Sequence, residues 1–186
     1  MTRILYIHGF KSTGNALKAQ ILKKKFDNVF SPTMPISPKE AMLFLEKEMI
    51  ENQYNLVIGS SLGGFLAMCL HKEFGVKVLL INPSLAPWES LKNQVGIHKR
   101  FETNETFEWT EDYNEQLQTI DNHLKNNTIL SEKLYFFLSS DDELLNHSKI
   151  PDLFPKATIK YFDNAGHQFT AFTRTIPEIK EIIECP

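Results

Sequence analysis

Ser61 lies in the stretch Gly59-Ser60-Ser61-Leu62-Gly63, which fits the pattern Gly-x-Ser-x-Gly. In this pattern the serine stands on a sharp turn between a strand and a helix, and small neighbours let the backbone pass close to the turn. The turn exposes the hydroxyl, and the N-terminus of the following helix favours negative charge beside it. The pattern therefore predicts that Ser61 is a nucleophile. A helix-capping role for Ser61 is the alternative, and Ser60 competes only by being adjacent.

A serine hydroxyl is a weak nucleophile until a base removes its proton. Where such a serine turn occurs, the acid and the base follow it in the order Ser, Asp or Glu, His, and only His147 and His167 lie far enough downstream. His167 ends the loop at residues 163–167, where a glycine lets the chain reach back. His147 lies in a helix predicted at residues 143–147. We therefore expect His167 to be the base and keep His147 as the alternative.

Three consecutive carboxylates, Asp141, Asp142 and Glu143, follow a strand predicted at residues 134–138. A carboxylate placed there would fix the tautomer of the histidine and stabilise the imidazolium that forms during the reaction. Spacing alone does not choose among the three. The two that are not used would face solvent or place charge at the N-terminus of the predicted helix that follows.

The sequence His8-Gly9-Phe10 follows the first predicted strand, at residues 3–7. A His-Gly turn at this place points backbone N–H groups toward the serine. We expect the N–H of Phe10 and the N–H of Leu62 to be the two donors that stabilise a developing oxyanion. His8 precedes the serine in the chain and is expected to be structural.

Short apolar segments alternate with longer amphipathic segments along the chain, which indicates strands separated by helices. This alternation predicts an α/β fold with right-handed βαβ units and a mostly parallel sheet of six strands, covered by helices on both faces. The alternation lapses between residues 82 and 132, and we interpret that segment as an insertion over the active-site edge. The strands are predicted near residues 3–7, 29–30, 56–58, 77–81, 134–138 and 158–162, and the helices near residues 15–26, 37–51, 64–74, 113–124, 143–147 and from 176 onward.

The composition narrows the class of protein. A length of 186 residues predicts a single domain spanning residues 1–186. The net charge of −3 argues against a general nucleic-acid or anionic-membrane binder, and no apolar run approaches the roughly 18 residues of a membrane-spanning helix. The N-terminal apolar stretch is too short for a signal peptide. Two cysteines and no histidine cluster with zinc spacing favour a cytoplasmic protein without structural metal or cofactor.

With these motifs in this order, the chain resembles the α/β-hydrolase superfamily, and most of all its small bacterial esterases of the YqiA type. The resemblance rests on five stretches that span nearly the whole chain: residues 6–12, 59–64, 82–91, 142–143 and 166–169. It implies the strand order 2-1-3-4-5-6, with the first two strands of the superfamily missing, and it implies Asp142 as the acid. The chain departs from the family pattern at Asp141, where the family usually has glycine.

The expected function is a serine hydrolase that cleaves small-molecule carboxylic esters or thioesters through Ser61, His167 and Asp142, with an acyl-enzyme intermediate. The alternatives are an acyltransferase that uses the same triad and a hydrolase-fold binding module that has lost catalysis. Four aromatic residues of the inserted segment either wall an acyl pocket or are plain core: Trp88, Phe101, Phe107 and Trp109. Lys92, Lys99 and Arg100 either meet the phosphates of an acyl-CoA or belong to a solvated face.

Overall fold

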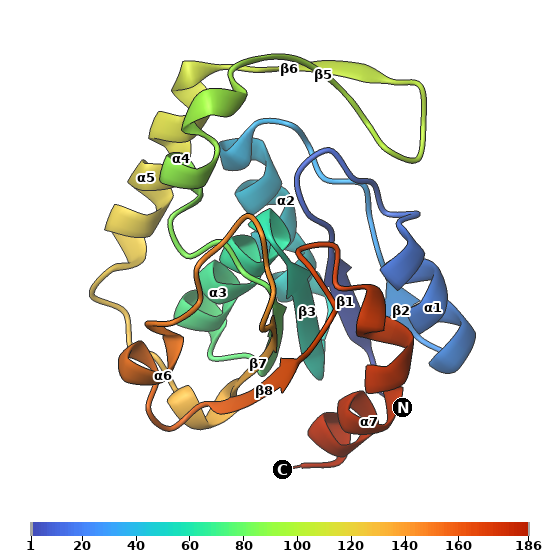
Figure 1. The fold of residues 1–186 in the computed structure, drawn as a ribbon. Helices are drawn as coiled ribbons and strands as arrows, with labels where there is room; N and C mark the ends of the chain where they lie inside the picture. Colours follow the sequence, from blue (N-terminus) through green and yellow to red (C-terminus); the bar gives the residue numbers. More distant parts are fainter. Residues whose placement is uncertain (1, 186) are drawn as a thin grey trace.

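The computed structural model describes residues 2–185 and contains a six-stranded parallel sheet and a separate antiparallel hairpin (Figure 1). The spatial order of the sheet is β2-β1-β3-β4-β7-β8, which reads 2-1-3-4-5-6 when only its own strands are counted. The predicted α/β class is confirmed. The strands of the sheet are β1 (Ile4–Ile7), β2 (Val29–Phe30), β3 (Leu56–Ser60), β4 (Val78–Ile81), β7 (Leu134–Ser139) and β8 (Thr158–Phe162).

Helices cover both faces of the sheet because its central strands are apolar on both sides. Every residue of β1, β3, β4 and β7 is buried, as is typical of parallel sheets between helical layers. Leu5 and Ile7 share one apolar cluster with α2, α3 and α5, whereas Ile4 and Tyr6 share the other with α1 and α7. The helices are α1 (Leu17–Lys25), α2 (Pro38–Glu51), α3 (Leu62–Phe74), α4 (Pro87–Ser90), α5 (Glu111–Leu124), α6 (Ile150–Leu153) and α7 (Ile176–Glu184), with short 3-10 turns at Lys92–Gln94, Ser131–Lys133 and Thr170–Thr175.

The prediction of a helix at residues 143–147 is wrong. The chain there forms a loop, and α6 begins further on, at Ile150. The backbone N–H groups of Leu144 and Leu145 both donate to Asp142 Oδ1, each at 2.9 Å. A short polar side chain that binds nearby backbone in this way competes with helix formation, so Asp142 begins a turn instead.

The inserted segment at residues 82–132 contains α4, a hairpin that the sequence did not predict, and α5. The hairpin pairs β5 (Gly96–Lys99) with β6 (Thr106–Trp109) and crosses the top of the molecule in Figure 1. Phe101, in the turn between β5 and β6, donates its N–H to Lys11 O, so the hairpin touches the loop that follows β1. Among the helices formed by residues 2–185, none has both the length and the apolar character needed to cross a membrane.

Candidate active site

Ser61 lies on the turn between β3 and α3, with a left-handed backbone φ of 54°. Such a sparsely populated conformation costs a non-glycine residue about 1–3 kcal/mol, and hydrogen bonds on both sides hold it in place. Ser61 N–H donates to Ile81 O at 3.0 Å, and Ser61 O accepts the N–H of Gly64 at 2.9 Å. A Cβ on Gly63 would lie 2.2 Å from Ile7 O. The glycine of the motif therefore reflects the close approach of this turn to β1.

The structure brings Ser61, His167 and Asp142 together in one chain of hydrogen bonds. Ser61 Oγ lies 3.0 Å from His167 Nε2. On the other side of the ring, His167 Nδ1 lies 3.0 Å from Asp142 Oδ2 and 3.1 Å from Oδ1. A carboxylate that accepts the Nδ1 proton leaves Nε2 free to accept the proton of the serine hydroxyl. This is the order of groups that nucleophilic catalysis by serine requires.

Asp142 is held in its ionised form although its side chain is only 1% exposed. Burial raises the pKa of Asp142, but the hydrogen bonds from His167, Leu144 and Leu145 outweigh burial and leave the pKa below its ordinary value. Asp142 therefore carries a negative charge at neutral pH, next to the ring on which positive charge would develop.

The two carboxylates beside Asp142 bind the backbone that carries His167. Asp141 Oδ1 accepts the Ser139 hydroxyl at 2.6 Å and the backbone N–H groups of Ala165 and Gly166 at 3.0 and 3.2 Å. Glu143 Oε2 accepts the N–H of His167 itself at 2.8 Å. Asp141 is exposed, as expected, but it caps no helix. Instead it links the loop after β7 to the loop that carries His167.

Asn82 also binds the backbone of this loop, and the sequence analysis did not single it out. Its Nδ2 donates to Gly166 O at 2.9 Å and to His167 O at 3.2 Å, while its Oδ1 accepts the Ser139 N–H at 2.8 Å. Asn82 is fully buried and has a positive φ of 41°. Its only signal in the sequence is its place at the end of a predicted strand, within one of the stretches that carry the resemblance.

The other two histidines that were considered do not reach Ser61. His147 is buried, and its Nδ1 lies 3.8 Å from Asp142 Oδ2. His8 donates from Nδ1 to Gly9 O and accepts the Met34 N–H at Nε2, both at 2.9 Å. Burial lowers the pKa of His8 to about 4, so its ring is neutral and ties the loop after β1 to the segment before α2.

One expected oxyanion donor directly follows Ser61 in the chain, and the other belongs to a loop that passes close to it. Leu62 is the first residue of α3, directly after Ser61, and Phe10 belongs to the loop after β1. A Cβ on Gly9 would lie 3.9 Å from Ser61 Oγ, so this loop passes close to the serine. Within residues 2–185, neither the N–H of Phe10 nor that of Leu62 donates to another protein group. Both therefore stay available to an oxygen bound beside the serine.

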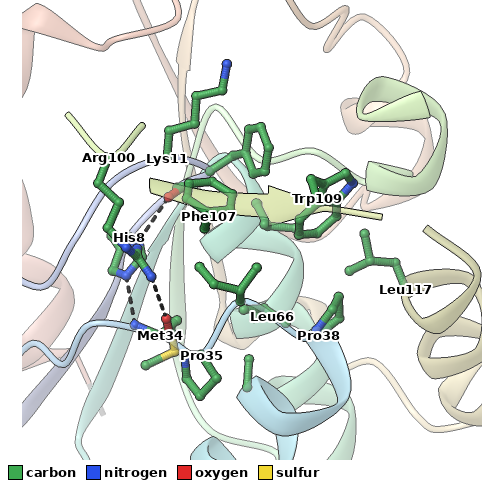
Figure 2. A pocket seen from close by; sticks show the side chains of 15 residues that line it. His8, Lys11, Met34, Pro35, Pro38, Leu66, Arg100, Phe107, Trp109 and Leu117 are labelled. Carbon is green, nitrogen blue, oxygen red and sulfur yellow. Dashed lines mark hydrogen bonds between the residues drawn. The ribbon is translucent and has the colours of Figure 1, made fainter. Parts of the chain in front are cut away.

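A cavity of about 40 Å³ opens beside these donors (Figure 2). Phe10 and Leu62 line it, together with apolar side chains of α2, α3, α5 and the hairpin. In Figure 2, Trp109 and Leu117 lie toward one end, and His8 and Arg100 lie toward the other. The cavity is therefore an apolar chamber that begins at the expected oxyanion site.

The inserted segment contributes to the cavity only in part. Phe107 and Trp109 line it, whereas Trp88 packs edge-on against Phe65 and Phe101 is 65% exposed. Of the three cations considered, Lys92 and Lys99 are exposed.

Arg100 is buried and donates to the backbone carbonyls of Ser12 and Met34. It does not belong to a solvated face, because its guanidinium is engaged with the protein itself. No group of three or more histidine, cysteine or acidic side chains that could hold a metal ion occurs in the described range 2–185.

Solved structures that share this fold are α/β hydrolases. A monoacylglycerol lipase from Paleococcus ferrophilus matches with a TM-score of 0.66 and 12% identity, covering 98% of this chain and 96% of its own. An alpha/beta superfamily hydrolase from Oenococcus oeni matches with a TM-score of 0.61 and 13% identity, covering 99% and 93%. Est1E from Butyrivibrio proteoclasticus, solved with ferulic acid, has a TM-score of 0.66 and 11% identity, covering 100% and 90%. The chain thus has the α/β-hydrolase fold.

The chain belongs to the family described as Uncharacterised protein family (UPF0227), whose pattern its residues 3–184 match. A UPF0227 protein of Pasteurella multocida is 24% identical over 187 residues, covering 95% of this chain and 97% of its own. A second, from Yersinia pseudotuberculosis, is 25% identical over 187 residues, covering 95% and 96%. The resemblance inferred from the five sequence stretches is confirmed by these matches.

Proposed function

We propose that the protein is a serine hydrolase that cleaves carboxylic ester or thioester bonds of small molecules. The observation that carries the proposal is the hydrogen-bonded chain Ser61 Oγ to His167 Nε2, at 3.0 Å, and His167 Nδ1 to Asp142 Oδ2, at 3.0 Å. These are the distances at which a base can take the proton of the nucleophile while the acid orients the base. Solved esterases and lipases that share the fold support the same class of reaction.

In the first half of the proposed reaction, Ser61 Oγ attacks the acyl carbon and His167 Nε2 takes the hydroxyl proton. The carbonyl oxygen becomes an oxyanion, which the N–H groups of Phe10 and Leu62 stabilise. The bond to the alcohol or thiol then breaks, and His167 returns its proton to that leaving group. The acyl group remains on Ser61 as an ester.

In the second half, water replaces the leaving group. His167 takes one proton from the water as its oxygen attacks the acyl-enzyme, and the same oxyanion donors stabilise the second tetrahedral intermediate. Collapse releases the carboxylic acid and returns the proton to Ser61. Asp142 stays ionised throughout and stabilises the imidazolium in both halves.

The test is hydrolysis of p-nitrophenyl butyrate by the wild-type protein and by Ser61→Ala. Loss of the nucleophile of a triad lowers kcat by about 10⁶-fold, while the alanine side chain fits the same turn. A fluorophosphonate probe provides a second readout, because it labels activated serines without any knowledge of the substrate. Mass spectrometry of the labelled protein should locate the adduct on Ser61.

A catalytically inactive binding module would give neither hydrolysis nor labelling. If Ser61→Ala kept a tenth of the wild-type turnover, another group would be the nucleophile and the proposal would be wrong. An acyltransferase would label at Ser61 but would release acid slowly, with turnover rising when an alcohol or thiol acceptor is added.

A further inference from the structure

We propose that the β5–β6 hairpin holds the oxyanion loop, residues 8–12, in its working conformation, with Arg100 as a positioning residue. This inference rests on the proposed function, because it assigns a role in catalysis to a segment that makes no hydrogen bond to Ser61 or His167 within the described residues 2–185. It gives the hairpin a mechanical part in the active site, beyond covering an apolar cavity.

Arg100 connects three segments through one buried side chain. Its Nη1 donates to Ser12 O at 2.6 Å and its Nη2 donates to Met34 O at 3.2 Å (Figure 2 shows the bond to Met34). The side chain is only 5% exposed, and Nε lies 3.2 Å from the carboxylate of Glu105 in the hairpin. The rigid fork of a guanidinium suits this task, since it presents several donors in fixed directions.

The two residues after Arg100 bind the same loop. Phe101 N–H donates to Lys11 O at 2.8 Å, and the Ser12 hydroxyl donates to Glu102 Oε1 at 2.8 Å. Three consecutive hairpin residues thus each bond to residue 11 or 12. Because the contacts are this dense, a shift of the hairpin would move the loop with it.

The loop needs such support because Lys11, the residue after the expected donor Phe10, has a left-handed φ of 63°. A lysine avoids this conformation, since its Cβ crowds the backbone. Without the hairpin, the loop would relax toward negative φ at this position. Relaxation there would turn the peptide planes on either side of residue 11 and, through the backbone of Phe10, displace the Phe10 N–H.

The side chain of Phe10 is held by the hairpin as well. Its ring packs edge-on against His98, Phe107 and Trp109, with centroid distances of 5.2, 5.8 and 5.0 Å. All three partners lie on β5 or β6. The two strands therefore hold the side chain of Phe10, and the turn between the strands holds the backbone that follows Phe10.

An oxyanion forms only in the transition state and in the tetrahedral intermediate, so a misdirected donor should lower kcat and leave KM nearly unchanged. The primary variant is Arg100→Met, which keeps the apolar stem and removes the fork. Removing a whole oxyanion donor costs about 10²- to 10³-fold in kcat. A displaced donor should cost less, about 10- to 100-fold, with KM for p-nitrophenyl butyrate changed by no more than about twofold.

The matched control is Lys99→Met, which replaces the adjacent basic side chain, at an exposed position of the hairpin, by the same residue. Its kcat should equal that of the wild type. Butylboronic acid, which forms a tetrahedral anionic adduct with an activated serine, provides an independent readout. Its affinity should fall in Arg100→Met by the same factor as kcat, because it reports on stabilisation of the tetrahedral state.

The strain at Lys11 allows a rescue experiment that a merely structural role for Arg100 would not predict. Glycine adopts positive φ without penalty, so Lys11→Gly should restore a large part of the lost kcat in the Arg100→Met background. If Arg100→Met does not fold, Arg100→Lys replaces it in every measurement, because a lysine keeps the charge but cannot reach both carbonyls.

The outcomes separate this inference from the proposed function. If wild-type protein neither hydrolyses the ester nor reacts with a fluorophosphonate, the proposed function fails. If wild-type protein is active and the Arg100 variant has wild-type kcat and boronate affinity, the proposed function stands and this inference is overturned. Loss of kcat that Lys11→Gly does not rescue would also overturn it.

Discussion

Glu143 Oε2 accepts the backbone N–H of His167 at 2.8 Å, while the ring of the same histidine bonds to Asp142, the residue before Glu143. Adjacent carboxylates thus fix the backbone and the side chain of one residue. Asp141 extends the pattern to the two residues before His167. One acidic tripeptide therefore binds three consecutive residues of the histidine loop, and its three members should differ sharply in their effect on catalysis.

Replacement of the central acid, Asp142→Asn, should have the largest effect of the three. The amide cannot impose the tautomer that Asp142 imposes on His167, and it carries no charge to stabilise an imidazolium. The kcat for p-nitrophenyl butyrate should fall by as much as about 10⁴-fold. The near-ultraviolet circular dichroism of the variant should match that of the wild type, which would show that the loss is catalytic.

Asp141→Ala should have a smaller effect of a different kind. The variant removes the acceptor for two backbone N–H groups, so His167 loses part of its support but keeps its acid. Displacement of a catalytic group by about 1 Å can cost about 10²-fold, and a loosened loop should cost about 10-fold in kcat, with little change in KM.

Asp152→Ala, at an exposed position in α6, is the control for this variant and should behave as the wild type. If Asp141→Ala were as impaired as Asp142→Asn, the division of labour among the carboxylates would be wrong. Wild-type kcat in Asp141→Ala would show that Asn82 and Glu143 hold the loop without it.

The serine turn could be predicted from the sequence because five consecutive residues, 59–63, record its geometry. The close contact between Gly63 and Ile7 O leaves room for glycine alone, so the residue type records the geometry. No residue type near Asp141 and Asp142 records the choice between them. That choice depends on the turn formed when Leu144 and Leu145 donate to Asp142, and on the position of the distant loop that carries His167.

The hairpin and Asn82 escaped prediction for related reasons. The side chains of β5 alternate between partly buried and exposed, but none is buried and Ile97 is 78% exposed. The strand therefore lacks the buried apolar face by which a half-buried strand is recognised in a sequence. Asn82 acts through hydrogen bonds to Gly166 and His167, which lie 84 and 85 positions further along the chain. No local pattern encodes a partner at that separation.

The free energy of unfolding should fall on acidification, in part because of His8. Burial lowers the pKa of His8 in the folded protein to about 4, from an ordinary value of 6.5. Below pH 6.5 the unfolded chain therefore binds a proton that the folded protein excludes, and stability falls until the folded pKa is reached. The full contribution is about 3 kcal/mol, and urea unfolding at pH 7 and at pH 4.5 should reveal most of it.

His8→Gln removes this titration and should flatten the dependence of stability on pH, although it lowers stability at pH 7. Part of the slope should remain, because burial also lowers the pKa of His71 and of His147, and these groups act in the same direction. An unchanged slope in His8→Gln would contradict the assignment of His8 as a buried neutral histidine.

We expect Leu117 to limit the length of the acyl group, if the cavity is the acyl site of the proposed hydrolase. The side chain is fully buried and lines the cavity (Figure 2), at the end away from His8. Because a water-sized group needs about 10–15 Å³ of such space, a volume of about 40 Å³ holds roughly three of them, which suits a butyryl chain. Leu117→Ala should extend the cavity and raise kcat/KM for p-nitrophenyl hexanoate relative to butyrate by about 10-fold or more.

Leu124→Ala is the matched control, because Leu124 is also buried in α5 but does not line the cavity. Both variants should lose about 2–5 kcal/mol of stability through the same truncation, so the comparison separates loss of packing from change of the pocket. The two esters are therefore assayed at a temperature where both variants remain folded. A shift toward hexanoate in Leu117→Ala alone would identify the cavity as the acyl site. An equal shift in both variants, or none in either, would mean that the acyl chain binds elsewhere.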